Sequence, residues 1–175
     1  MLRTKLIATV AAAGIAGLSG TYAHAEEFSA HLIGFNETPS ILSGGSGTFK
    51  LDLDRSAGTA NYELTYSGLS STATQAHIHF AKARVAGGII VWLCQTATNP
   101  GPPGTPTCPP DGGTVTGTIT ASTIVAVPAQ LVSAGDFSAL TDALTSHSAY
   151  ANVHTTAAPA GEIRGQIYRS DNNEK

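Results

Sequence analysis

The fold is decided by residues 48–66, TFKLDLDRSAGTANYELTY. Apolar and polar side chains alternate on both sides of its centre, so that Phe49, Leu51 and Leu53 share one face of an extended chain. The central residues 54–59 are rich in Asp, Ser and Gly, which are typical of turns. Period-two alternation on both sides of a turn predicts a β-hairpin with one buried face.

The same alternation recurs along the rest of the chain. It predicts further strands at residues 28–33, 75–80, 87–93, 114–120, 149–154 and 162–168. One stretch has a helical pattern, in which Asp136 can cap a helix and Phe137, Leu140 and Leu144 follow at helical spacing. A shorter helical turn is expected after Pro128. Short strands separated by Gly and Pro turns, with one short helical connection, predict an all-β fold, an antiparallel Ig-like β-sandwich.

Residues 1–25 have the pattern of a secretory signal peptide. Arg3 and Lys5 precede an apolar stretch at about residues 6–18, and Ala-His-Ala at residues 23–25 is an A-x-A cleavage site. The apolar stretch is too short to span a bilayer comfortably. We therefore expect a protein that is exported to the periplasm or secreted.

Beyond the signal peptide we expect one β-sandwich domain at residues 26–170 and a disordered polar tail at residues 171–175. Seven of the nine Lys and Arg residues and all twelve acids follow residue 25, which gives this part a formal charge of −5. No basic run is present, so nucleic acid is excluded as a partner. No later stretch is long and apolar enough for a transmembrane segment.

Two cysteines, Cys94 and Cys108, enclose a loop rich in Pro and Gly. An oxidising compartment allows them to form a disulfide, which would stabilise the fold by roughly 3 kcal/mol in the chain-entropy model. The alternative is a redox-active or metal-binding thiol pair. Their spacing matches no C-x-x-C motif, which favours the structural disulfide.

Three segments together resemble the CHRD domain family: AHIH at residues 76–79, GGIIVWL at residues 87–93, and YANVHT at residues 150–155 continuing to PAGEIRGQI at residues 159–167. The resemblance covers nearly all of the chain after residue 26. It implies a β-sandwich related to the copper/zinc superoxide dismutase architecture, found in exported bacterial proteins and in an animal secreted signalling antagonist. The resemblance therefore predicts the fold of the chain but does not assign a specific function to it.

Histidines are the candidate metal ligands. His77 and His79 lie two residues apart on one strand, so their side chains project to the same face roughly 6.5–7 Å apart. The resemblance implies that the strand of His154 is a neighbour, which makes His154 the third candidate. His31, on the outward face of the first strand, is a candidate fourth ligand or supporting residue. A site of three or four imidazoles suits copper, and zinc less well by the Irving–Williams order. The alternative is that these are surface histidines that bind no metal.

Other polar residues are candidates for supporting roles. Asn152 could hold an imidazole by a hydrogen bond. Glu162 and Arg164 lie on one strand face and are expected to form a salt bridge or to anchor a loop, with steering of an anion as the alternative. Trp92 is expected in the core.

Three functions remain open at this point: a copper-binding module, a copper enzyme that acts on superoxide or another small oxidant, and a structural or interaction domain without a metal. Residues 95–113 contain no His and only one acid, Asp111, so the ligands of a dismutase zinc subsite are missing. We therefore expect little or no dismutase activity. No protein partner can be named from the sequence.

Overall fold

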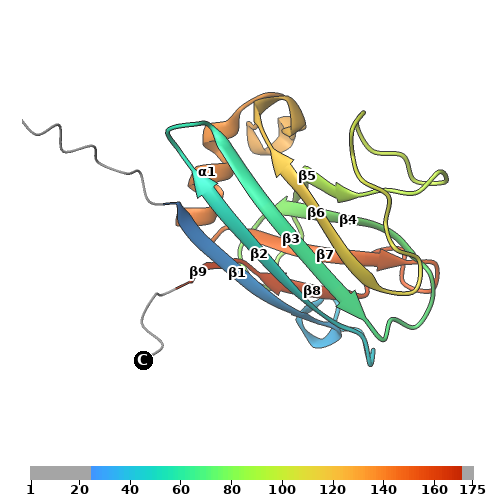
Figure 1. Ribbon diagram of the computed structural model, residues 1–175. Helices are drawn as coiled ribbons and strands as arrows, with labels where there is room; N and C mark the ends of the chain where they lie inside the picture. Colours follow the sequence, from blue (N-terminus) through green and yellow to red (C-terminus); the bar gives the residue numbers. More distant parts are fainter. Residues whose placement is uncertain (1–24, 171–175) are drawn as a thin grey trace, which may run out of the picture.

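The computed structural model describes residues 25–170, which fold into antiparallel strands with one short α-helix (Figure 1). The strands are β1 (Glu26–Ile33), β2 (Ser46–Asp54), β3 (Thr59–Ser67), β4 (Ala73–Phe80), β5 (Gly88–Cys94), β6 (Gly113–Ile119), β7 (Ala149–Thr155), β8 (Ile163–Gln166) and β9 (Tyr168–Arg169). The helix α1 spans Phe137–Thr145, and 3-10 turns lie at Gly34–Asn36, Ala121–Thr123 and Pro128–Gln130. The expected signal peptide, apart from Ala25, and the expected tail at residues 171–175 lie outside the described residues.

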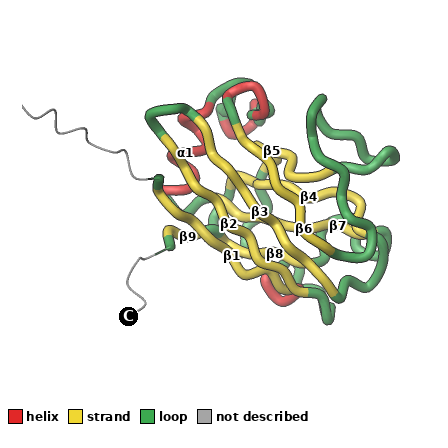
Figure 2. The backbone as a smooth tube through the Cα atoms, in the orientation of Figure 1, coloured by secondary structure: helices red, strands yellow, loops and turns green. Residues whose placement is uncertain are grey.

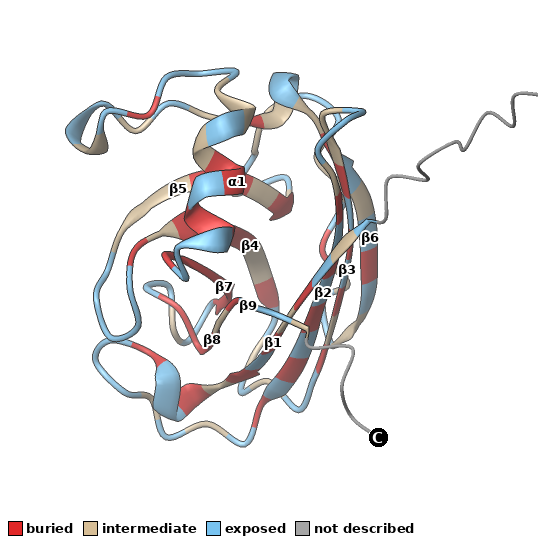
Figure 3. Cartoon of the chain, turned by 90° about the vertical axis from the view of Figure 1, so that its left-hand side faces the viewer, coloured by how far each residue is buried: buried red, intermediate tan, exposed pale blue. Residues whose placement is uncertain are grey.

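The strands form one sheet in the order β5-β4-β7-β8-β1-β2-β3-β6, with β9 paired to β1. Between β8 and β1 the ladder has a single register pair, Ile33 with Arg164, and there the sheet bends into two layers. Figure 3 shows β1, β2, β3 and β6 facing β4, β7 and β8 across a common interior. The predicted all-β, antiparallel sandwich-like fold is confirmed.

The hairpin of residues 48–66 forms as predicted. β2 pairs with β3 in a register that places Phe49 opposite Leu64 and Leu51 opposite Tyr62, all four buried. The carboxylate of Asp54 accepts a hydrogen bond of 2.9 Å from the backbone N–H of Ala57 and so closes the turn. Alternating apolar side chains thus cover the interior while their polar neighbours face water.

The core lies between the two layers and is closed at one side by α1. Leu140 and Leu144 of the helix are fully buried, and Asp136 caps its N-terminus by accepting a hydrogen bond from the backbone N–H of Ala139. The predicted helix, its cap and the short turn after Pro128 are confirmed. The predicted strand at residues 162–168 is interrupted at Ile167, because β8 pairs with β7 whereas β9 pairs with β1.

Cys94 and Cys108 form the predicted disulfide. The enclosed loop extends beyond the strands, as Figure 2 shows. The amide of Gln95 crosses this loop, donating to the backbone oxygen of Thr105 at 2.7 Å and accepting from the backbone N–H of Gly101 at 2.6 Å. Side-chain hydrogen bonds therefore order a segment that has little regular backbone pairing. Among the described residues no helix is long and apolar enough to cross a membrane.

Candidate metal centre

Strands β4 and β7 bring the three predicted histidines together. In their antiparallel register His77 lies opposite Asn152 and His79 lies opposite Tyr150. His154 is two residues beyond Asn152, so its ring lies beside His77, and its Nε2 atom is 3.1 Å from His77 Nδ1. One ring nitrogen from each of the three histidines lies within 4.8 Å of the others. The predicted convergence of three imidazoles is present.

The histidines are buried, whereas the sequence predicts an outward, polar strand face. His77 is 0 % exposed, His79 7 % and His154 6 %. Their neighbours Ala76 and Ile78 fill the core on the other side of β4, so this strand is buried on both faces. Trp92 of β5 and Tyr150 of β7 pack against these rings, and strand alternation cannot reveal such contacts.

Two of the rings are held by backbone carbonyls. His79 Nδ1 lies 2.9 Å from the oxygen of Gly87, and His154 Nδ1 lies 3.0 Å from the oxygen of Pro159. Because a carbonyl only accepts, both Nδ1 atoms carry the proton, and this assigns the lone pairs to the Nε2 atoms. Such a carbonyl contact is the usual support of a metal-binding histidine, since it fixes the ring and its tautomer.

Two of the ring nitrogens have no partner. The Nε2 atoms of His77 and His79 are buried and receive no hydrogen bond from any described residue. A buried polar atom without a hydrogen-bond partner lowers the stability of the fold by on the order of 1–3 kcal/mol. An ion that accepts their lone pairs would remove this cost.

Burial keeps the three histidines uncharged. Together with the nearby His154, it lowers the pKa of His77 to about 2 and that of His79 to about 4. Burial also lowers the pKa of His154. All three imidazoles are therefore neutral at pH 7, which is the form that binds a metal.

Two aromatic rings enclose the histidines. Trp92, opposite His77 in the register of β4 and β5, meets the His77 ring edge-on with centroids 4.3 Å apart. Trp92 is half-buried at the site, which differs from the expected core position. The ring of Tyr150 stacks on His79 with centroids 4.7 Å apart. Tyr150 was not predicted as a site residue; its place at the site follows from the strand register, which sets it opposite His79.

Asn152 lies at the site, as expected. Its side-chain amide lies 3.1 Å from His154 Nε2, and because that nitrogen is unprotonated, the amide holds the ring by a hydrogen bond when its NH2 group faces it. It also contacts Glu37, a buried carboxyl that the sequence analysis did not identify. Burial raises the pKa of Glu37 to about 7, against the opposing effect of nearby Arg164. Asn152 thus connects a buried acid to the imidazoles.

Arg164 and Glu162 do not pair with each other; both ion pairs in the described part of the chain belong to Glu26. The Arg164 guanidinium lies over the Tyr150 ring, 3.3 Å from its centroid. The Glu162 carboxylate accepts hydrogen bonds from Ser43 at 2.6 Å, from Thr155 at 2.6 Å, and from both the backbone and the hydroxyl of Ser70. Of the two expected roles, the salt bridge is therefore wrong, and Glu162 acts as a loop anchor.

His31 is not brought to the cluster. It lies on the exposed outer face of β1, with Ala30 and Leu32 on either side of it buried in the core. β1 belongs to the opposite layer from β4 and β7, so an outward side chain there points away from the three histidines. The cluster therefore consists of three imidazoles, and His31, expected as a fourth ligand or supporting residue, is not part of it.

The model of the CHRD domain family matches residues 28–167. No curated protein matches the chain, and neither does any solved structure. The relation to the copper/zinc superoxide dismutase architecture stays a prediction. The family match covers all the elements that carry the three histidines, Trp92 and the disulfide. On this match the chain belongs to the CHRD domain family.

Proposed function

We propose that this protein is an exported metal-binding module that holds a copper ion through His77, His79 and His154. The observation that carries the proposal is the convergence of three neutral, buried imidazoles, two of which present Nε2 atoms with no partner. The CHRD fold supplies the two adjacent strands on which this arrangement depends.

The donor set fits copper. All three donors are imidazole nitrogens, which suit copper and zinc, and copper binds such a set more tightly in the Irving–Williams order. One ring nitrogen from each of the three histidines lies within 4.8 Å of the others, which places three imidazole donors around a single point. A bound copper ion would supply one-electron redox chemistry, whereas zinc would not.

The burial of the three histidines favours a site that stores an ion and not one that catalyses a reaction on a substrate. The side chains are at most 7 % exposed, and Trp92 and Tyr150 pack against two of the rings. An organic substrate would have no access to ligands covered in this way. Storage, delivery or tolerance of copper fits this arrangement better than catalysis.

Export is part of the proposal. The disulfide between Cys94 and Cys108 is of the kind that persists in an oxidising compartment. It agrees with the signal-peptide pattern at residues 1–25. A copper site outside the cytoplasm would meet the metal before cytoplasmic thiols could compete for it.

The test is a competitive titration of metal-free protein with copper and with zinc, followed by isothermal calorimetry. We expect one site per chain, tighter for copper than for zinc. His79→Ala should weaken copper binding by at least about a hundredfold, since a ligand is lost. His31→Ala is the matched control, because it removes an exposed imidazole outside the cluster and should leave the affinity unchanged. Copper binding that is equally weak in the wild type and in His79→Ala would contradict the proposal.

A further inference from the structure

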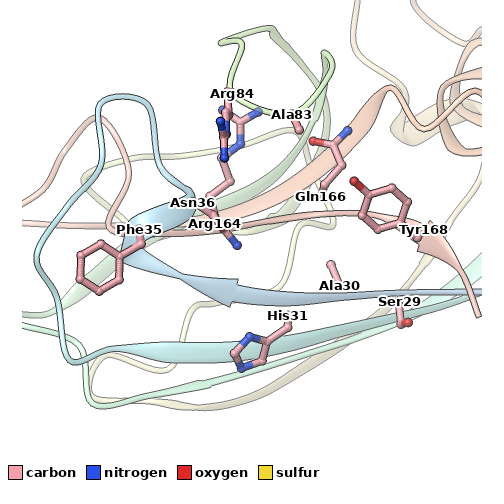
Figure 4. Close-up of a pocket in the computed structure, with 10 residues that line it drawn as sticks. All are labelled: Ser29, Ala30, His31, Phe35, Asn36, Ala83, Arg84, Arg164, Gln166 and Tyr168. Atoms are coloured by element: carbon pink, nitrogen blue, oxygen red, sulfur yellow. The ribbon is translucent and has the colours of Figure 1, made fainter.

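A groove of about 530 Å³ lies between β1, β8 and the loop that follows β4 (Figure 4). It is lined by Ser29, Ala30, His31, Phe35, Asn36, Ala83, Arg84, Arg164, Gln166 and Tyr168. Its volume lies within the range of sites that hold small-molecule ligands. None of the ten lining residues is acidic, although the whole chain has a formal charge of −3. The groove is therefore a basic depression on an acidic protein.

Arg84 lines this groove from a turn that is held by hydrogen bonds from Arg164. Its backbone is in the left-handed region, with φ +64°, which is uncommon for a residue other than glycine. The Arg164 guanidinium donates to the backbone oxygens of Lys82 at 3.2 Å and Val85 at 2.9 Å, on both sides of Arg84. Arg84 itself is exposed and makes no hydrogen bond or ion pair with another described residue. Strained backbone positions cluster at functional sites, and this one exposes a guanidinium that can bind an anionic ligand.

Aromatic rings stand at the two ends of the groove. Figure 4 shows Phe35 at one end, Tyr168 at the other, and His31 across β1 from Arg84. Phe35 is 64 % exposed and Tyr168 50 % exposed, although both carry large apolar surfaces. Exposed aromatic rings beside polar groups are typical of binding sites for ligands with both apolar and polar faces.

Amide groups lie between the aromatic ends. Asn36 and Gln166 line the groove. The amide of Asn36 is exposed and can bind a hydroxyl group, whereas Gln166 donates to the backbone oxygens of Ala81 and His147 and its Oε1 atom is buried. The groove thus offers a cation for a carboxylate, an amide for a hydroxyl and aromatic rings for the apolar faces of sugar rings.

We propose that this groove binds an acidic oligosaccharide, with the carboxylate of a uronic acid on Arg84 and sugar rings against Phe35 and Tyr168. The proposal is independent of the copper site, because none of its contacts uses the three clustered histidines. An acidic peptide would use the charge but leave the two aromatic ends without matched partners. A simple anion would use Arg84 alone.

The test measures binding of trigalacturonate to the metal-free protein by calorimetry, with its fully methyl-esterified form as the neutral match. We expect saturable binding of the acid, weaker by about tenfold for the ester. Arg84→Gln should weaken binding of the acid by about tenfold, because it removes the charge but keeps a polar side chain. Phe35→Ala should weaken binding of both forms. Arg55→Gln, which removes one positive charge near the far end of β1, is the control and should leave the affinity unchanged.

Several results would overturn the proposal. These are an absence of saturable binding up to about 10 mM, equal affinity for acid and ester, and an affinity unchanged by Arg84→Gln. If sulfate at the same concentration displaced trigalacturonate completely, the groove would be a simple anion site. Tighter binding of a tetraglutamate peptide would assign it to acidic peptides instead. Because the protein is metal-free throughout, none of these results depends on whether copper binds.

Discussion

The edge of the His77 imidazole meets the indole of Trp92, with ring centroids 4.3 Å apart and planes at 84°. Trp92 is the only tryptophan of the chain, so the protein carries one fluorescent reporter beside the proposed ligands. This contact joins β4 to β5 at the buried end of the histidine cluster. It provides a direct optical measure of whether the site is filled.

Copper(II) should quench the fluorescence of Trp92. A paramagnetic, redox-active ion near the indole deactivates its excited state, whereas zinc has a filled d shell and should cause little loss. Titration with excitation at the red edge of indole absorption should therefore show stoichiometric quenching by copper. His77→Ala should abolish this quenching at equimolar copper, and His31→Ala should retain it. Equal quenching in both variants would show that the copper binds elsewhere.

Copper should stabilise the wild-type fold. An ion that binds only the folded state raises the free energy of unfolding by about 2.7 kcal/mol when its free concentration is a hundred times the dissociation constant. Thermal unfolding with and without copper should show this as a rise in Tm. In the His77→Ala/His79→Ala double variant the rise should disappear; a rise of the same size there would place the stabilising copper outside the cluster.

Acid should destabilise the metal-free protein through its histidines. The folded-state pKa values of His77 and His79, about 2 and about 4, lie below the ordinary value of 6.5. Below pH 6.5 the unfolded chain therefore binds protons that the folded chain excludes. The contribution of the two histidines to the free energy of unfolding should be complete above pH 6.5. It should fall as the pH drops from 6.5 toward 4. Urea unfolding at several pH values should show that the free energy of unfolding falls less steeply with decreasing pH in the His77→Ala/His79→Ala double variant than in the wild type. An identical slope would mean that these rings do not resist protonation.

Glu37 should have the opposite pH dependence. Its folded-state pKa is raised from 4.5 to about 7 by burial, so the folded chain holds a proton that the unfolded chain releases above pH 4.5. Its contribution to stability is present below pH 4.5 and is lost as the pH rises toward 7. Glu37→Gln keeps the shape of the protonated acid and should make the fold more stable at pH 8 by roughly 2–3 kcal/mol. Urea unfolding should show almost no difference between the two proteins at pH 4; a variant less stable than the wild type at pH 8 would indicate that ionised Glu37 is held favourably.

Local pattern was sufficient to predict most of the fold. Phe49, Leu51 and Leu53 alternate with polar neighbours, and this period is the direct consequence of a sheet with one buried face. The helix was predictable for a similar reason, since Asp136 and the spacing of its leucines fix where it begins and which side it buries. The break at Ile167 was not predictable, because it depends on a change of partner strand.

The candidate site was predictable only in part. The pair His77 and His79 is visible in the sequence, but the place of His154 depended on knowing which strands are neighbours. The carbonyls that hold two of the rings belong to Gly87 and Pro159, in the loops that follow β4 and β7, and the path of these loops cannot be read from strand alternation. His31 has the same local pattern as a ligand, and only the arrangement of the layers separates it from the cluster.

The most direct test is elemental analysis of the protein purified from its native compartment, alongside the His77→Ala/His79→Ala double variant prepared in the same way. We expect about one copper per wild-type chain and none above background in the variant. A wild-type protein that carries no copper, and takes up none when it is offered, would contradict it.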